Sequence, residues 1–476
     1  MNPIETNGPG EDMLRFQDYR QHVEQLMSAA LDAADPGEAV KRFLRREDGI
    51  LHIGDLTYDL TLGRVYLISV GKAAAPMAEA AIEILGDDLH SAVVISKMGS
   101  ETAVALADRQ LPGVLLLEGN HPVSGAESVR ATQVVIQTLS QTVVNDLVLC
   151  LISGGTSALL TLPVILLAEW QSLTNALLAS GCSISEFNTV RRQLDRVKGG
   201  GLAQMAAPSQ CVSLILSDVV GNPLPAIGSG PTTFIDESAD DAIAVLKRYA
   251  VAEHIDKDVW DRIIQTLEQA PQTRRVAGQR NDHIIVGDVR HSATSAMAKA
   301  MQLGFVAQML TTRLEGEARE VARIAAAIAK DMPAGRCLIL GGETTVKLRA
   351  GGLGGRNQEL ALAAAVALDG WPDIVIASFA TDGEDGPTPA AGAVVSGETA
   401  EFSRHLGLDP VAFLDRNDSF HFFQHLDESL KQSVDAKRED ERLPVTLLTP
   451  GPTGTNVNDL LIILSYPSDS VNEEVT

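Results

Sequence analysis

Short apolar runs alternate with helical stretches along almost the whole chain, and this alternation limits the fold more than any other feature. Each run is rich in Val, Ile and Leu and ends near a Gly, Ser or Asp. Apolar runs of this kind are typical of parallel strands buried on both faces. The clearest runs cover residues 65–70, 92–96, 114–117, 147–152, 212–216, 284–286, 337–340, 374–379, 445–448 and 460–464.

The stretches between these runs have the pattern of amphipathic helices. We predict helices over residues 73–85, 127–139, 186–196, 290–303, 318–331 and 358–368. Strands that alternate with helices indicate a layered, doubly wound α/β fold, and irregular spacing disfavours a closed barrel. We interpret the polar stretch 268–282 as the crossing between two domains and the stretch 427–442 as a surface insertion.

Composition and charge argue against several kinds of partner and cellular location. The 476 residues carry a formal net charge of −24, which disfavours nucleic acid and anionic membranes as partners. The four cysteines are widely spaced, which fits a reduced, cytoplasmic setting. The N-terminus lacks the pattern of a signal peptide, and no apolar run is long enough to span a bilayer. We expect a cytoplasmic protein and leave a homo-oligomer open.

Glycine, hydroxyl and carboxylate side chains follow most of the predicted strands. Ligands of open parallel sheets bind beyond the carboxyl ends of the strands, where glycine lets backbone N–H groups approach an anion. One such segment alone is more often an ordinary tight turn, but several at successive strand ends favour a phosphate or carboxylate site. The segments are 71–72, 120–122, 153–157, 217–218, 341–345, 381–386 and 451–456.

An acidic protein that binds an anion must concentrate a few cations at the site. Lys72 follows a buried strand, at a helix start that disfavours lysine unless an anion is bound. Arg356 follows a segment with four glycines in five positions, 351–355, and can form paired hydrogen bonds to phosphate. The glycines also predict a loop that closes on the ligand. A solvated lysine and a flexible hairpin tip are the simpler alternatives.

Two acidic segments are candidates for Mg²⁺ or for proton transfer. Asp218 ends a strand, where a carboxylate can bind Mg²⁺, accept a hydroxyl proton or cap a turn. Asp382, Glu384 and Asp385 form a second acidic loop, suited to Mg²⁺ or to substrate hydroxyls but without EF-hand spacing. We take Asp218, Asp382 and Asp385 as the candidate metal ligands.

The common catalytic and nucleotide-binding motifs are missing. The chain has no GxxxxGK[ST] loop, no GxGxxG turn after a strand, no HExxH pair and no GxSxG elbow. His421 and His425 are one helical turn apart, but no third ligand accompanies them, so zinc is disfavoured.

Taken together, the segments resemble the glycerate 2-kinase family, whose C-terminal part is called the MOFRL domain. The match extends from about residue 12 to residue 464 and is specific. The matching segments are SVGKAAAPMAEAA, GNHPVSG, LISGGTSALL, FNTVRRQLDRVKGGGLA, LSDVVGNPLPAIGSGPT, LGGETTVKLRAGGLGGRNQELALAAA, FATDGEDGPTPAAGA and GPTGTNVNDL.

The resemblance implies a fold and a reaction. We expect an N-terminal Rossmann-like α/β/α domain with a parallel sheet over residues 12–275. A C-terminal α/β domain with the MOFRL segment is expected over 276–468, and the active site in the cleft between the domains. The implied reaction is phosphorylation of D-glycerate by ATP at the 2-hydroxyl, with Mg²⁺, which gives 2-phosphoglycerate and ADP.

The resemblance also implies roles for residues. Lys72, Asp218 and Arg356 match the proposed catalytic residues of the family. One departure is Gly287-Asp288-Val289, where many relatives read Gly-Ser-Asn. The expected substrate or nucleotide contacts are Gly71, His121, Ser153, Gly154, Gly155, Thr156, Ser157, Lys198, Glu343, Gly355, Asn357, Thr453 and Asn456.

Two other functions remain open. An oxidoreductase acting on hydroxypyruvate, a label sometimes attached to such sequences, is disfavoured by the missing nicotinamide fingerprint. A non-catalytic sugar-acid-binding protein would not need both the Lys and Arg cations and the acidic loops.

Overall fold

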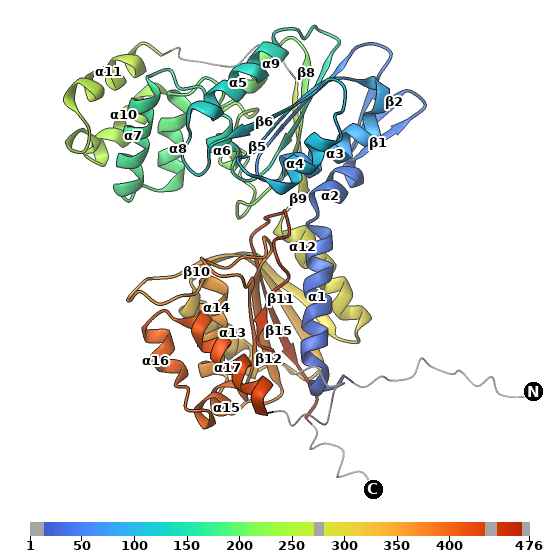
Figure 1. Cartoon of the computed structure of the whole chain (residues 1–476), viewed down its shortest axis with the longest axis vertical. Helices are drawn as coiled ribbons and strands as arrows, with labels where there is room; N and C mark the ends of the chain where they lie inside the picture. The colour runs from blue at the N-terminus through green and yellow to red at the C-terminus, as the bar shows by residue number, and fades with distance from the viewer. Residues whose placement is uncertain (1–13, 271–279, 434–444, 469–476) are drawn as a thin grey trace, which may run out of the picture. The chain divides into compact units, whose positions relative to one another are not determined.

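A computed structural model describes residues 14–270, 280–433 and 445–468, which form two compact units (Figure 1). We call Asp35–Asp288 with Gly454–Val457 the parallel-sheet unit. The mixed-sheet unit contains the remaining described residues, which are 14–34, 289–433, 445–453 and 458–468. None of the helices in these described ranges has the length and apolarity needed to cross a membrane.

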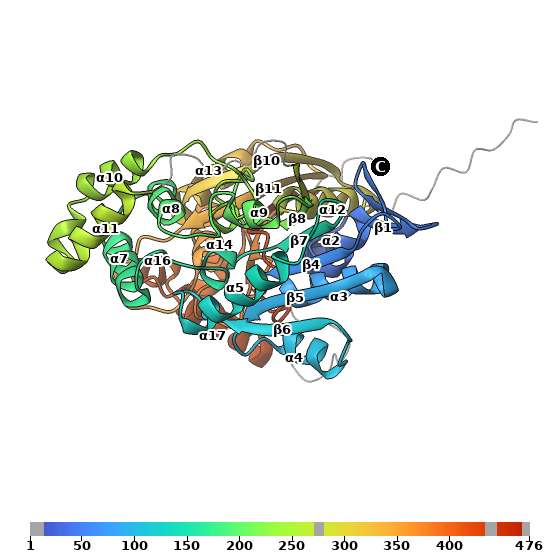
Figure 2. The same cartoon turned by 90° about the horizontal axis from the view of Figure 1, so that it is seen from above.

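The parallel-sheet unit is built on six strands in the order β6-β5-β4-β7-β8-β9, and every neighbouring pair is parallel. Figure 2 shows β6, β5, β4, β7 and β8 following one another across this sheet. All side chains of β4 and β7 are buried, as the apolar runs predicted. The strands are β4 Val65–Val70, β5 Leu89–Lys97, β6 Val114–Gly119, β7 Leu147–Ile152, β8 Gln210–Leu216 and β9 Asn281–Gly287.

Helices cover both faces of this sheet. Apolar side chains of α5 and α9 pack with alternate residues of β4, such as Ile68, while α2 and α3 pack on the sheet from the opposite side (Figure 1). A separate helical cluster joins α7, α8, α10 and α11. The helices are α2 Pro36–Phe43, α3 Ala74–Leu85, α4 Glu101–Asp108, α5 Ala126–Leu139, α6 Thr156–Leu159, α7 Leu167–Ala179, α8 Ile184–Gln193, α9 Gly201–Ala206, α10 Ala239–Arg248 and α11 Lys257–Glu268.

The mixed-sheet unit has six strands in the order β10-β11-β15-β12-β13-β14. Only β10 and β11 are parallel, and the other neighbours are antiparallel. This corrects the expectation that all the apolar runs form parallel strands, because burial on both faces does not fix strand direction. The strands are β10 Val306–Glu317, β11 Arg336–Thr345, β12 Ile374–Ala380, β13 Gly392–Ser396, β14 Leu447–Leu448 and β15 Asp459–Ser465.

Side chains of β15 alternate between the two faces of the mixed sheet. Leu460 and Ile462 pack with α1 and α12, whereas Leu461 and Ile463 pack with α13, α14 and α17. Figure 1 shows α1 and α12 on one side of this sheet and α13, α14, α16 and α17 on the other. The helices are α1 Tyr19–Ala33, α12 Val289–Gln302, α13 Ala318–Lys330, α14 Arg356–Ala367, α15 Thr399–His405, α16 Pro410–Asp415 and α17 Ser419–Ser433.

The expected α/β sandwich with a parallel sheet and the expected second α/β domain are therefore confirmed, but the units are divided differently from the expected boundary at 275 and 276. The helix α1 belongs to the mixed-sheet unit, because its apolar stripe packs against α12. The strand β9 belongs to the parallel-sheet unit, because it pairs with β8. Residues 271–279 of the expected crossing and 434–442 of the expected insertion lie outside the described residues.

Sequence reasoning missed a small antiparallel sheet of three strands, β1 Leu44–Glu47, β2 Ile50–Ile53 and β3 Leu56–Asp59. Its strands have four residues each, and polar or charged residues interrupt them, so they do not give the long apolar signal that marks β4 or β7. The predicted helix 186–196 begins earlier, because Ser183 and Glu186 form a capping box at the start of α8.

Candidate active site

Polar side chains gather at one edge of the parallel sheet, where the carboxyl ends of its strands meet. Lys72 follows β4, Lys97 ends β5, His121 follows β6, Ser153 follows β7 and Asp218 follows β8. Because these strands are parallel neighbours, their ends lie side by side. The structure thus brings together predicted residues of four separate sequence segments, and Lys97, which was not predicted, lies with them.

Gly155 shows how closely this edge is packed. Its φ of 85° lies in the left-handed region that favours glycine. A Cβ on Gly155 would lie 3.1 Å from Cδ2 of His121 and 3.3 Å from Cγ of Lys72. Lys72, which is exposed, also donates its backbone N–H to the carbonyl of Gly154 at 2.8 Å. Lys72, His121 and Gly155 therefore form one contact group.

Two side-chain hydroxyls of the segment 153–157 hydrogen-bond it to the end of β4 and the start of α3. Ser153 Oγ accepts the backbone N–H of Ala73 at 3.1 Å, and Thr156 Oγ1 donates to the carbonyl of Val70 at 2.8 Å. No acceptor for the backbone N–H of Gly154 or Gly155 is found in the described part of the chain. Adjacent N–H groups in such a turn form a concave donor site for an anion.

Asp218 lies directly against this segment. A Cβ on Gly154 would lie 2.2 Å from Oδ2 of Asp218, so only glycine allows this approach. Burial raises the pKa of Asp218 above its usual range, although the charge of Lys72 acts in the opposite direction. A carboxylate that is destabilised by burial is a better proton acceptor than one in water.

His121 is neutral at physiological pH in this environment. Burial, together with the charges of Lys72 and Lys97, lowers the pKa of His121 to about 4. A neutral imidazole can donate one hydrogen bond and accept another. His121 can therefore orient a hydroxyl or carboxyl group, while the positive charge of the edge comes from the lysines.

Lys198 was expected to contact substrate or nucleotide, but it is fully buried. Its Nζ donates to the carbonyls of Ser157 at 2.7 Å and Leu160 at 2.8 Å, and lies 3.6 Å from Asp195. These three partners match the three N–H donors of an ammonium group. The placement does not favour direct contact with a ligand, because the side chain lies behind the segment 153–157.

In the mixed-sheet unit, Arg356 begins α14 and forms a two-pronged hydrogen bond with Asp459 at the start of β15. Its Nη1 also lies 3.3 Å from Oε1 of Glu343. Burial acts to lower the pKa of Arg356, but the hydrogen bonds and charge of Asp459 outweigh burial and hold the pKa above its ordinary value. The guanidinium is charged and held in one orientation.

Asp385 stabilises the start of α14. Its carboxylate accepts the backbone N–H of Asn357 at 3.1 Å and of Gln358 at 2.8 Å. Asn357 is buried and also donates its amide to Asp385, while its amide oxygen accepts the hydroxyl of Ser378. Asp385 and Asn357 thus have internal partners, and these partners occupy the oxygens that a metal ligand would need.

The glycine-rich segment 351–355 is packed rather than loose. A Cβ on Gly352 would overlap the carbonyls of Arg416 and Asn417, and one on Gly354 would overlap the hydroxyl of Ser419. A Cβ on Gly355 would overlap Asp385, whereas Gly351 faces open space. Close approach of the backbone therefore explains three of the four glycines without loop closure.

Of the remaining predicted residues, Glu343, Asp382 and Thr453 belong to the mixed-sheet unit. Glu343 is exposed and accepts the amide of Asn458 at 3.4 Å. Thr453 donates its hydroxyl to the carbonyl of Thr381, next to the half-buried Asp382. Asn456 belongs to the short segment that groups with the parallel-sheet unit. The structure assigns none of these residues to a ligand.

A preformed metal site is not found in the described residues, since no three or more His, Cys, Asp or Glu side chains gather to hold an ion. Mg²⁺ in nucleotide sites is commonly held by one or two carboxylates, phosphate oxygens and water. Asp218 and Asp382 fit this limited role, because each is only half-buried. Asp385 does not fit it, because its oxygens bind the start of α14.

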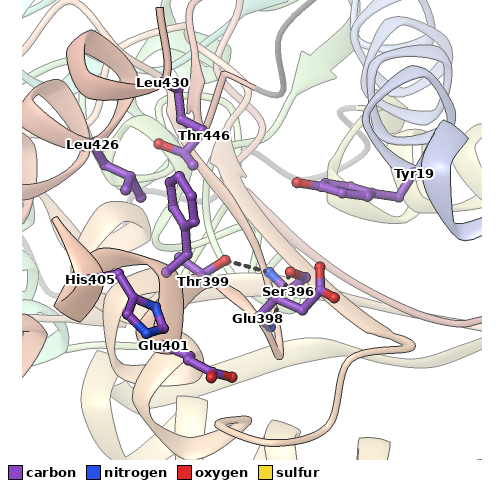
Figure 3. Close-up of a pocket in the computed structure, with 10 residues that line it drawn as sticks. Tyr19, Ser396, Glu398, Thr399, Glu401, His405, Leu426, Leu430 and Thr446 are labelled. Atoms are coloured by element: carbon purple, nitrogen blue, oxygen red, sulfur yellow. Dashed lines mark hydrogen bonds between the residues drawn. The ribbon is translucent and has the colours of Figure 1, made fainter. Parts of the chain in front are cut away.

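A surface pocket of about 420 Å³ lies elsewhere in the mixed-sheet unit (Figure 3). Glu398, which precedes α15, and Glu401 and His405 of α15 line it on one side, and Tyr19 of α1 lies across from them. None of the predicted site residues lines this pocket. Its size therefore does not mark it as the site of the chemistry.

Sequence reasoning missed three charged residues around the predicted ones. Lys97 could have been found by the rule that selected Lys72, because it also ends a strand of the parallel sheet. Asp459 stands just after the predicted 451–456 segment, but nothing in the sequence pairs it with Arg356. Arg191, which donates to the carbonyl of Ser157 at 2.9 Å, reads as an ordinary helix residue.

Comparison with known proteins shows which family this chain belongs to. Residues 22–264 match a domain of unknown function (DUF4147), and residues 336–459 match the MOFRL family. The chain is 39% identical to D-glycerate 2-kinase of Thermotoga maritima over 92% of its own length and 96% of that protein. It is 34% identical to glycerate kinase of Danio rerio over 93% and 97%.

A solved structure agrees as well. The crystal structure of glycerate kinase from Thermotoga maritima superposes with a TM-score of 0.80 at 36% identity, covering 94% of this chain and all of that one. The resemblance seen in the motifs is therefore confirmed, and the chain belongs to the glycerate 2-kinase family.

Proposed function

We infer that this protein is a glycerate 2-kinase, which transfers the γ-phosphoryl group of ATP to the 2-hydroxyl of D-glycerate. The observation that carries this function is the near full-length similarity to kinases of that name. In the reaction, the hydroxyl oxygen bonds to the γ-phosphorus while the bond from phosphorus to the β–γ bridging oxygen breaks. The hydroxyl proton passes to a base, and 2-phosphoglycerate and ADP leave.

At the parallel-sheet edge, we propose that Lys72 and the N–H groups of Gly154 and Gly155 bind an anionic group of the substrates. The supporting observations are an exposed cation and two backbone donors around one concave segment. The charge matters because a chain of net charge −24 would otherwise repel glycerate and ATP. The neutral His121 would orient a hydroxyl or carboxyl group.

For Asp218 we propose the role of base that accepts the proton of the 2-hydroxyl. Its raised pKa and its position beside Lys72 and Gly154 support this role. Asp218→Asn should then lower kcat without weakening the Mg²⁺ dependence. Recovery of the variant at high Mg²⁺ would instead make Asp218 a metal ligand.

In the mixed-sheet unit, we propose that Arg356 binds phosphate oxygens with the donors that Asp459 and Glu343 leave available. A guanidinium has five N–H donors, so it can keep its pair with Asp459 and still contact an anion. We also propose that Mg²⁺ accompanies ATP, with Asp382 as its protein ligand. Bound there, the ion would neutralise phosphate charge.

The deciding experiment incubates the purified protein with D-glycerate, ATP and Mg²⁺ and identifies the product by ³¹P NMR. The expected product is 2-phosphoglycerate rather than 3-phosphoglycerate. Oxidation of NADH or NADPH by hydroxypyruvate, without phosphorylation, would favour the oxidoreductase. Binding of glycerate without any turnover would favour a non-catalytic protein. We further propose a cytoplasmic enzyme, because all four cysteines are free thiols.

A further inference from the structure

Two buried cations converge on a single carbonyl oxygen behind the proposed anion-binding segment. Lys198 Nζ and Arg191 Nη2 donate to the carbonyl of Ser157 at 2.7 and 2.9 Å. The side chain of Lys198 is fully buried, and Arg191 is only 8% exposed. Neither cation has the exposure needed to contact a substrate, so the proposed reaction leaves both without a role.

Burial makes both cations costly to keep. It lowers the pKa of Lys198 to about 8 and the pKa of Arg191 to about 10, although the charge of Asp195 acts in the opposite direction on both. Asp195 is itself buried and accepts the backbone N–H groups of Leu162 and Val197. Burying a charge costs free energy, so a buried cation that does not contact a ligand must have another role.

The carbonyl that these cations hold belongs to a very short helix. The helix α6 has four residues and directly follows Gly154 and Gly155. Lys198 binds the carbonyls of Ser157 and Leu160 near its end, where unpaired carbonyls are stabilised by a cation. A helix of this length has little stability of its own, so these contacts decide where its first residues lie.

The side chain of Ser157 is held as well. Its hydroxyl lies 2.8 Å from that of Ser229, which in turn donates to Asn188 at 3.0 Å. Ser229 is fully buried and has a φ of 63°, an uncommon conformation for a residue other than glycine. Three groups, Lys198, Arg191 and Ser229, therefore bind one serine directly beside the site.

We propose that Lys198, assisted by Arg191, is a positioning residue that acts through Ser157 to hold the N–H groups of Gly154 and Gly155 against Lys72. The proposal rests on the function proposed above. In this proposal the two cations set the geometry of the anion-binding segment and do not contact the anion. A displacement of about 1 Å at such a segment can lower the rate by about 100-fold.

The experiment compares variants at temperatures where each is folded, as judged by circular dichroism. Lys198→Met alone leaves Asp195 buried without its partner, so Lys198→Met with Asp195→Asn is the variant of choice. The matched control is Arg192→Met, since Arg192 is equally buried but pairs with Glu237 and the carbonyl of Pro225. We expect kcat/KM to fall by about 100-fold in the double variant and by less than about threefold in the control.

A second readout separates positioning from general stability. Arg191→Lys keeps the charge and should retain more activity than Arg191→Met, although both lose packing against Phe187. In a background of Lys72→Ala, the Lys198 and Asp195 changes should cost little more, because both act on the same anion contact.

Two results would overturn the proposal: a double variant that behaves like the Arg192→Met control, or losses that add fully to that of Lys72→Ala. The wild-type assay with D-glycerate, ATP and Mg²⁺ is run first. Its failure would reject the kinase function itself, and the outcomes for Lys198 are compared only in an active protein.

Discussion

The guanidinium of Arg356 donates to both carboxylate oxygens of Asp459, although 103 residues separate the two in the chain. The pair lies where α14 and β15 begin, so two elements of the mixed-sheet unit set its geometry. The side chain that we propose to bind phosphate is therefore held in place before any ligand arrives, and conformational freedom need not be lost on binding.

Arg356→Lys should lower kcat/KM by about 10- to 100-fold, because an ammonium keeps the charge but cannot form the paired hydrogen bonds. Steady-state kinetics with D-glycerate and ATP measure this loss. Arg323→Lys, on an exposed position of α13, is the matched control and should be silent. Kinetics of Arg356→Lys within twofold of wild type would place the residue outside the reaction.

Lys72→Ala should reduce kcat/KM by about 10²- to 10³-fold, the usual effect of losing one preorganised charge contact. The melting temperature should change little, because the side chain is exposed. Lys257→Ala provides the control, since Lys257 is also an exposed lysine at a helix start in the same unit. An active Lys72→Ala enzyme would contradict the proposed anion site.

Turnover should depend on a divalent cation. Exhaustive treatment with EDTA, followed by gel filtration into metal-free buffer, should abolish phosphorylation, and added Mg²⁺ should restore it. The melting temperature without nucleotide should be the same before and after, because no preformed metal cluster is found in the described residues. Full turnover in a preparation shown to be metal-free by elemental analysis would refute the requirement.

Asp385 should give the protein a measurable pH dependence of stability. Burial raises the pKa of Asp385 to about 6, above its value in the unfolded chain. Its contribution to stability is therefore present below about pH 4 and lost as pH rises through about 6. Asp385→Asn lacks this group, so its melting temperature relative to wild type should rise between pH 4.5 and about pH 7. A constant difference across this range would contradict the assignment.

The glycine-rich segment offers a test by paired substitutions. Gly355→Ala should lower the free energy of unfolding by about 2 kcal/mol, because its Cβ would overlap Asp385 at the start of α14. Gly351→Ala should be nearly neutral, since no atom lies within 4 Å of its Cβ position. Urea denaturation followed by circular dichroism compares the two. Equal effects would mean that the packing described here is not what selects glycine.

The strand-end residues could be predicted because the point where a buried strand ends is a local property of the sequence. A strand end is visible in the sequence, and the parallel order of β4 to β8 then brings Lys72, His121 and Asp218 to one edge. Partners across the fold could not be predicted in this way. The Arg356 and Asp459 pair depends on β15 running antiparallel to β11, and apolar runs do not reveal direction.

Burial of charge was equally hidden from the sequence. Lys198 lies in a glycine-rich segment that looks suited to ligand binding, yet its ammonium group donates hydrogen bonds to two backbone carbonyls. A lysine beside glycines reads the same whether it faces solvent or the interior. Only the positions of Ser157, Leu160 and Asp195 distinguish these two cases.

The place of α1 in the mixed-sheet unit has a consequence for biosynthesis. Its apolar stripe, which includes Val23, Leu26 and Met27, packs with residues of α12 and of the central strands. The ribosome makes these partners only after it has made Asp35–Asp288, the main part of the parallel-sheet unit. The apolar stripe of α1 therefore lacks its native partners until α12 and the central strands of the mixed sheet have been made.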